Sequence, residues 1–189
     1  MSTSLTDEDR GALLRLARSA IAAKLDSGNQ VEKPASLSPP MQEKRGCFVT
    51  LHIRGALRGC IGNIEPVKPL VSGVEDNALN AAFRDPRFPR LSSEELPEVD
   101  IEVSVLTVPQ ILEYADGEDL KKKLKPGVHG VILSKGWHSA TFLPQVWEQL
   151  PDKEQFLAHL CQKGGMDSTG GTEPKNVGWA ERSVTHLFP

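Results

Sequence analysis

The chain has 189 residues, of which 39% are hydrophobic and 25% charged, and its formal net charge is -3. These proportions supply enough apolar side chains for a core and exclude an intrinsically disordered chain or a collagen-like repeat. No run approaches the roughly 20 apolar residues of a membrane helix, and the polar, acidic N-terminus is unlike a secretory signal. The composition therefore predicts a globular cytoplasmic protein without a bulk positive charge to attract nucleic acid.

The cysteines and histidines fit no common metal or disulfide pattern. Three cysteines are present, Cys47, Cys60 and Cys161, and no pair has C-x-x-C spacing. An odd, widely spaced set argues against a disulfide framework and against a zinc ribbon. The sequence also has no H-E-x-x-H, Walker or G-x-G-x-x-G motif. We therefore expect no metal and no cofactor.

The first predicted element is a helix that begins after Thr6. Three acidic residues follow this capping side chain, and apolar residues recur at helical spacing until Gly28. Residues 29–45 are polar and contain three prolines, which predicts a loop.

Residues 47–62 alternate apolar and polar side chains, which predicts a hairpin turning at Gly55. A three-residue loop over 54–56 would place Ile53 opposite Leu57 and keep both in one aliphatic layer. The side chains predicted on the opposite face are the polar ones: Thr50, His52, Arg58 and Cys60.

Further elements follow in the same way. Apolar spacing predicts a helix through Phe83, which Pro86 cannot continue, and residues 99–106 alternate as a strand. Later segments predict a hairpin with its turn at Gly136, a helix around Phe156 and Leu160, a Gly/Ser/Thr-rich loop over 166–176 and a strand over 179–188.

The order hairpin, helix, strand thus occurs twice along the chain. Gly136 takes the place of Gly55, and Glu181 takes the place of Glu102. Hairpins with single helices favour a mostly antiparallel α+β fold over a parallel α/β fold. We expect a single domain over residues 1–189, with two related β-β-α-β units at about 46–107 and 128–188.

Several motifs, in order along the chain, resemble the AMMECR-type domain family, whose prokaryotic members are called AmmeMemoRadiSam system protein A. They include Gly46-Cys-Phe-Val-Thr-Leu51, Leu57-Arg-Gly-Cys-Ile-Gly62, Asp85-Pro-Arg-Phe88 and Glu102-Val-Ser-Val-Leu106. Lys163-Gly-Gly-Met166 departs from the usual family pattern. The resemblance implies a barrel-like sheet with flanking helices, and partners of the Memo type and the radical SAM type. It implies no known reaction.

The candidate site is centred on Cys60, whose flanking glycine and nearby cation favour a nucleophilic thiol or thiolate. His52 and Glu102 are the candidate bases. The candidate substrate-binding residues are Arg58, Gly59, Asp85 and Arg87. These residues also have structural interpretations: a free cysteine is commonly buried, Arg58 can pair with Glu65 or Asp85, and Asp85 can organise the turn after the helix.

Three hypotheses therefore stand. The protein is an enzyme, or part of one, with a cleft around Leu57–Gly62. Alternatively it is a non-catalytic module that binds Memo-type or radical SAM proteins, or RNA, through Trp137 or the 29–45 loop. Nucleic acid is the less favoured partner, because the Lys121–Lys123 run is short. In a third, structural interpretation, the motif holds a bulge and Cys60 is a packing residue.

Overall fold

The computed structural model describes residues 4–166 and, by their backbone, residues 176–187. In these residues the fold is α+β. The helices are α1 (Asp7–Leu25), α2 (Pro39–Gln42), α3 (Leu70–Phe83), α4 (Gly117–Lys123) and α5 (Lys153–Lys163), with short 3-10 helices at Leu96–Glu98 and Pro144–Glu148. The strands are β1 (Cys47–Ile53), β2 (Ala56–Asn63), β3 (Val99–Leu106), β4 (Gln110–Leu112), β5 (His129–Lys135), β6 (His138–Phe142) and β7 (Asn176–Leu187). Within the described ranges, no helix has the length and apolar character needed to cross a membrane.

The chain divides into two compact units. The first runs to Leu106 and includes the end of β7 from Ser183, and the second runs from Thr107 to Arg182. Each contains a hairpin, a helix and a strand in that order, namely β1-β2-α3-β3 and β5-β6-α5-β7. The expected order of elements is therefore present twice, while the single domain with sub-units at about 46–107 and 128–188 stays a prediction.

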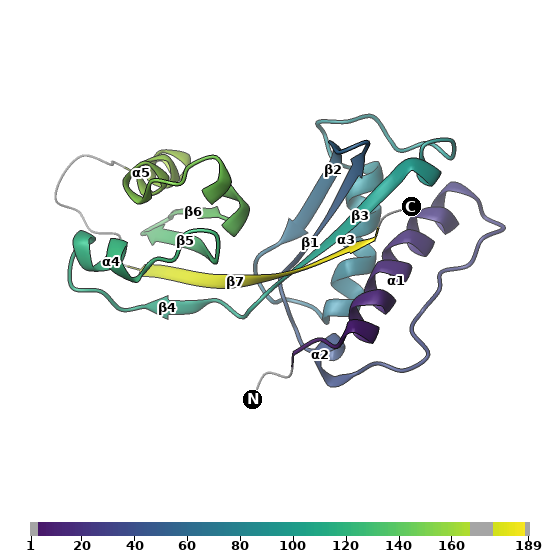
Figure 1. The fold of residues 1–189 in the computed structure, drawn as a ribbon, viewed down its shortest axis with the longest axis horizontal. Helices are drawn as coiled ribbons and strands as arrows, with labels where there is room; N and C mark the ends of the chain where they lie inside the picture. The colour runs from purple at the N-terminus through teal and green to yellow at the C-terminus, as the bar shows by residue number, and fades with distance from the viewer. Residues whose placement is uncertain (1–3, 167–175, 188–189) are drawn as a thin grey trace. The chain divides into compact units, whose positions relative to one another are not determined.

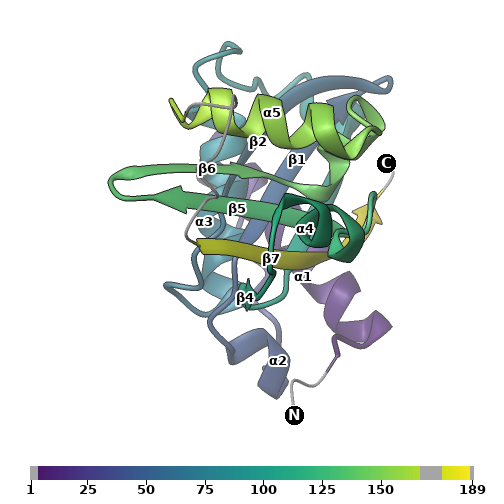
Figure 2. The ribbon, with the colours of Figure 1, turned by 90° about the vertical axis from the view of Figure 1, so that its left-hand side faces the viewer.

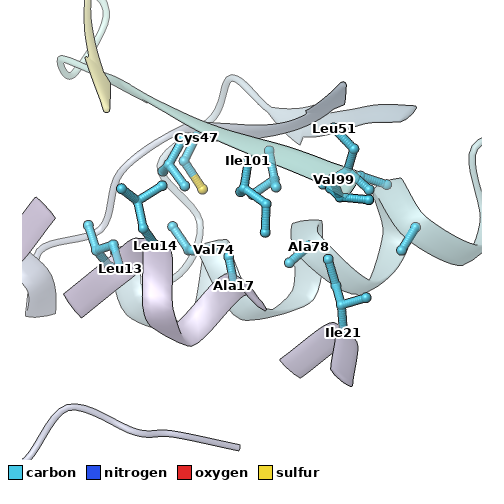
Figure 3. Packing of buried hydrophobic residues seen from close by; sticks show 14 of the residues in the cluster. Leu13, Leu14, Ala17, Ile21, Cys47, Leu51, Val74, Ala78, Val99 and Ile101 are labelled. Atoms are coloured by element: carbon cyan, nitrogen blue, oxygen red, sulfur yellow. The ribbon is translucent and has the colours of Figure 1, made fainter. Parts of the chain in front are cut away.

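In the first unit, β1 lies between β2 and β3 in an antiparallel sheet, and α1 and α3 pack side by side on one face of it (Figure 1). The inward side chains of the strands meet those of the two helices in one core (Figure 3). Its members include Leu14, Ala17 and Ile21 of α1, Val74 and Ala78 of α3, Cys47 and Leu51 of β1, and Val99 and Ile101 of β3.

The predicted start of α1 is confirmed. The Asp9 N–H donates to Thr6 Oγ1 at 3.1 Å, and the Thr6 N–H donates to the Asp9 carboxylate at 2.9 Å. This reciprocal capping box satisfies two amide groups that the first helical turn leaves without partners. The expected helix through Phe83 is also confirmed, and α3 begins directly after Pro69.

The β1–β2 hairpin confirms half of the predicted register and corrects the other half. Thr50 pairs with Cys60 and Leu51 with Gly59, as expected, but His52 pairs with Leu57 rather than Arg58. The turn has two residues, Arg54 and Gly55, both with positive φ (53° and 78°) as a type I′ turn requires. A β-bulge at Arg58 absorbs the extra residue.

The bulge changes the face that Leu57 occupies. It pairs with His52 instead of Ile53, and its side chain is exposed rather than part of the aliphatic layer. The three-residue loop was therefore a wrong prediction. That prediction follows from strict alternation of side chains along β2. One bulged residue interrupts the alternation, so a two-residue turn is compatible with a Cys60 side chain on the outward face.

In the second unit, β5 lies between β6 and β7, and β4 pairs with the other side of β7. Figure 2 shows α5 running alongside β6, with β5, β7 and β4 following in turn. Phe156 of α5 stacks on Trp147 with ring centroids 3.6 Å apart. The second hairpin and the helix around Phe156 are confirmed. The expected loop over 166–176 lies almost entirely outside the described residues.

The barrel-like sheet implied by the resemblance is corrected. The described strands form antiparallel sheets with no closed barrel, because β2 and β6 remain edge strands with one strand partner each. At β2 the reason is local: the outward N–H and C=O of Cys60 are bonded to the side chains of Asp85 and Arg87. A further strand cannot pair where these groups are occupied.

Candidate functional site

Cys60 lies on the face of the first sheet that points away from the aliphatic layer, as predicted, and its side chain is partly exposed. The Thr50 hydroxyl donates to the Cys60 sulfur at 3.2 Å. Thr50 also pairs with Glu102 on β3, so the three residues form one row across the sheet. Glu102 accepts a hydrogen bond from the Ser104 hydroxyl at 2.9 Å.

The turn after α3 holds the backbone of Cys60 from the edge of the sheet. The Cys60 N–H donates to Asp85 Oδ2 at 2.9 Å, and Arg87 Nη2 donates to the Cys60 carbonyl at 3.2 Å. Arg87 also binds the Asp85 carboxylate through Nε at 2.9 Å and Nη2 at 2.7 Å. Two motifs distant in sequence thus meet in one hydrogen-bonded cluster.

Asp85 is the buried centre of this cluster. Its side chain is only 1% exposed, whereas that of Arg87 is 54% exposed. The hydrogen bonds from Arg87, together with the Cys60 N–H, hold the pKa of Asp85 well below its ordinary value, although burial opposes this effect. The carboxylate in turn raises the pKa of Arg87. Asp85 also accepts the Arg87 N–H at 3.1 Å, so it organises the turn as expected.

Arg58 is held by partners that the sequence did not reveal. Its Nε and Nη2 donate to the two Glu95 carboxylate oxygens at 2.8 and 3.0 Å, and its Nη1 donates to the Pro89 carbonyl at 2.9 Å. The expected partners, Glu65 and Asp85, are therefore wrong. Glu95 lies 37 positions further along the chain, and no local spacing could pair it with a bulged strand residue.

The glycines of the Leu57–Gly62 motif are required by packing. A Cβ on Gly59 would lie 2.3 Å from the Ala81 carbonyl oxygen of α3, and one on Gly62 would lie 2.3 Å from the Phe48 ring. Real Cβ atoms do not come this close to backbone oxygen, so β2 and α3 can approach only without a side chain at Gly59. Gly59 thus fixes the helix against the strand that carries Cys60.

His52 shares the outward face with Cys60 but is not its cross-strand neighbour. It pairs with Leu57 on β2 and with Asp100 on β3. The Cys60 sulfur accepts a hydrogen bond from the Thr50 hydroxyl, and the Cys60 side chain also interacts with the Arg87 guanidinium. Of the candidate residues, the structure brings Cys60, Asp85 and Arg87 into direct contact. Gly59 lies beside Cys60 on β2, whereas His52 is in the next row and Arg58 is paired with Glu95.

The other two thiols have raised pKa values, which lowers their reactivity; Cys47 is buried and Cys161 is partly buried. Burial raises the pKa of Cys47 to about 11, and burial also raises the pKa of Cys161. Cys47 belongs to the core of the first unit and receives a hydrogen bond from Asn77 at 3.4 Å. In residues 4–166, whose side chains are described, no cluster of three or more His, Cys, Asp or Glu residues is arranged to hold a metal ion.

Comparison with known proteins places these residues in a family context. The sequence pattern of the AMMECR1 family matches residues 14–181. A protein of Methanothermobacter thermautotrophicus is 43% identical over 85% of this chain and 83% of its own length. A Methanopyrus kandleri protein is 44% identical over 88% of this chain and 82% of its own length.

The fold has a counterpart among crystal structures. An uncharacterised protein of Pyrococcus horikoshii superposes with a TM-score of 0.81 and 39% sequence identity, over 95% of this chain and 92% of that chain. The chain therefore belongs to the AMMECR1 family.

Proposed function

We propose that this protein is a non-catalytic binding module that contacts a partner protein through the tip of the β5–β6 hairpin. The observation that carries the proposal is the exposure of Trp137. Its relative solvent-accessible surface is 104%, so the residue is fully exposed. Tryptophan is enriched among residues that dominate binding energy at protein interfaces. A fully solvated indole at a turn gains nothing from the fold, so its apolar surface is available for a partner.

The chemistry of the motif residues supports a binding role over a catalytic one. The charged groups that could anchor a substrate are already paired inside the protein, Arg58 with Glu95 and Asp85 with Arg87. Releasing either would leave a buried or partly buried charge without its partner, which is costly. The Leu57–Gly62 motif therefore serves to hold together the β1–β2 hairpin, α3 and the turn that follows α3.

The partner we propose first is a Memo-type protein, with a radical SAM protein as the second choice, because the family resemblance implies both. Affinity of the full chain for each purified protein from the same organism is measured by calorimetry. We expect Trp137→Ala to weaken binding about thirtyfold or more, as for a central interface tryptophan. Ile111→Ala, which removes another exposed apolar side chain of the same unit, is the control and changes affinity less than about threefold.

Equal affinity of the Trp137→Ala variant and the wild-type chain would refute the assigned surface. Absence of binding to either purified protein would refute the proposed partners. Binding of a single-stranded RNA oligonucleotide instead, with the same loss in Trp137→Ala, would assign the hairpin tip to nucleic acid.

A second candidate function is thiol chemistry at Cys60. It is favoured by one observation: the partly exposed Cys60 side chain accepts a hydrogen bond from the Thr50 hydroxyl at 3.2 Å. In this alternative Cys60 acts as the nucleophile and His52 or Glu102 as the base. Arg87, whose side chain is half exposed beside the Cys60 carbonyl, anchors an anionic substrate with Asp85 and Gly59 shaping the site.

Alkylation with iodoacetamide at neutral pH, mapped by mass spectrometry, tests this alternative. The sulfur forms a bond to carbon and iodide leaves, so the rate reports the thiolate. We expect Cys60 to react before Cys47 and Cys161, and Thr50→Val to slow it about three- to tenfold. A rate unchanged by Thr50→Val, His52→Gln and Glu102→Gln would exclude an activated thiol.

A further inference from the structure

A cleft of about 660 Å³ lies in the first unit, lined by one face of α3 together with the end of β2, the segments flanking α3 and one residue of α1. Its volume falls in the range of pockets that hold small molecules. None of its lining residues belongs to the β5–β6 hairpin, and Cys60 is not among them. The cleft thus shares no lining residue with either of the surfaces discussed under the proposed function.

The cleft concentrates positive charge in a protein of net charge -3. Four of its lining side chains are cations, Lys24, Lys68, Arg84 and Arg90, and one is a carboxylate, Asp76. Lys68 pairs with Asp76 at 2.5 Å, so these two charges cancel. Among the residues whose side chains are described, the other three cations have no ion pair, which leaves about three positive charges on the cleft.

The two arginines of the cleft differ from other arginines of the same unit. Arg54, Arg58 and Arg87 each meet a carboxylate at 2.7–2.8 Å. The Arg84 guanidinium instead donates to the Asn80 side-chain oxygen at 3.4 Å, and the Arg90 guanidinium lies 5.3 Å from the centre of the Phe83 ring. Both guanidinium groups therefore keep donors that an oxyanion could occupy in bidentate fashion.

Helix ends account for part of this charge but not for all of it. Lys24 lies in the last turn of α1 and Arg84 is the C-cap of α3, where cations are favoured by the negative end of the helix. Arg90 lies beyond the Asp85–Arg87 turn and caps neither helix. Three cations that converge on one cleft from separate segments exceed what helix capping requires.

We propose that this cleft binds a small phosphorylated molecule, with Arg84 and Arg90 as the phosphate-binding residues and Lys24 as an additional positive charge. A phosphate monoester carries nearly two negative charges at neutral pH. It therefore matches three unpaired cations better than a ligand with a single carboxylate group would. The apolar side chains of Val67 and Phe83, which also line the cleft, provide a wall for the organic part of the ligand. This inference does not depend on the partner proposed above.

The test titrates the full-length protein with pyrophosphate, and separately with AMP, in a calorimeter at low ionic strength. We expect both probes to bind, and Arg84→Gln/Arg90→Gln to raise their dissociation constants about tenfold or more, since two charge-assisted contacts are lost. Both side chains are exposed, so the variant should fold, which circular dichroism verifies. Arg54→Gln, an exposed arginine outside the cleft, is the matched control and should change affinity less than about twofold.

A second variant, Arg84→Lys/Arg90→Lys, keeps the charge but removes the planar fork, so its affinity should fall between those of the wild type and the Gln variant. The inference is overturned if neither probe binds the wild type at millimolar concentration, or if Arg54→Gln weakens binding as much as the cleft variant does. Binding of an RNA oligonucleotide that greatly exceeds AMP binding would overturn the assignment to a small molecule. The Trp137→Ala variant should bind both probes normally, which separates this test from that of the partner protein.

Discussion

The two hairpins of this protein have similar turns but opposite surroundings. Both β1–β2 and β5–β6 turn in two residues, with Gly55 and Gly136 at positive φ of 78° and 62°. The first is held by ion pairs, Arg54 with Glu98 at its tip and Arg58 with Glu95 behind it. The second carries a fully exposed Trp137 at its tip. The two hairpins thus differ in their contacts: the arginines of the first are paired with carboxylates, while the second exposes a large apolar side chain.

The largest expected effect on stability is at the contact between β2 and α3. Gly59→Ala places a methyl group against the Ala81 carbonyl oxygen, so the helix must move away from the strand. We expect a loss of about 3 kcal/mol or more in the free energy of unfolding, measured by urea denaturation. Gly117→Ala is the control, because nothing lies within 4 Å of its Cβ position. Equal urea midpoints for the two variants would show that the contact between Gly59 and Ala81 does not constrain the first hairpin.

A smaller effect, with a defined pH dependence, is expected at Asp85. Its pKa is lower in the folded chain than in the unfolded one, so its ionised form stabilises the fold. That contribution is complete above the ordinary carboxyl pKa of about 4 and is lost as the pH falls below it. Asp85→Asn should lower the free energy of unfolding by about 2–3 kcal/mol at pH 7, because Arg87 and the Cys60 N–H lose a charged acceptor. The difference in this free energy between the variant and the wild type should become smaller towards pH 3.

Urea denaturation at several pH values measures this narrowing. Glu98→Gln, which breaks the exposed pair with Arg54, is the control and should cost less than about 1 kcal/mol at any pH. A difference between Asp85→Asn and wild type that stayed constant from pH 7 to pH 3 would contradict an ionised Asp85 as the source of the stabilisation.

The smallest effect on stability is expected at the tip of the second hairpin. Trp137→Ala should change the free energy of unfolding by no more than about 0.5 kcal/mol, since the side chain packs on nothing in the described part of the chain. A loss above about 1 kcal/mol would mean that the indole contributes to folding, and the contrast between the two hairpins would disappear.

Sequence patterns predicted the elements better than their contacts. Apolar periodicity predicted α1 and α3, because each buries one face, and it predicted β3 from the alternation of its first residues. The paired register of Thr50 with Cys60 also followed from alternation. The turn at Arg54-Gly55 did not, because a bulge at Arg58 breaks the alternation on which the register rested. The three-residue strand β4 was missed, since so short a segment has no period to detect.

The candidate site shows the same division. Its residues were identified by type, and Cys60 lies on the predicted face. Their partners depend on the chain returning from far away, as Glu95 does to Arg58 and Asp85 does to Cys60. Such contacts are set by how α3 and the turn after it fold back along β2, which no local pattern encodes. The cationic cleft likewise joins Lys24 to residues that lie 39–66 positions further along the chain.

The bonds from Asp85 and Arg87 to the backbone of Cys60 also affect how separate molecules meet. An edge strand with open amide and carbonyl groups recruits strands of other molecules and starts aggregation. Here the side chains of one short turn occupy these groups at the middle of β2. The turn after α3 therefore blocks strand addition at this point of the edge, in addition to holding the hairpin in place.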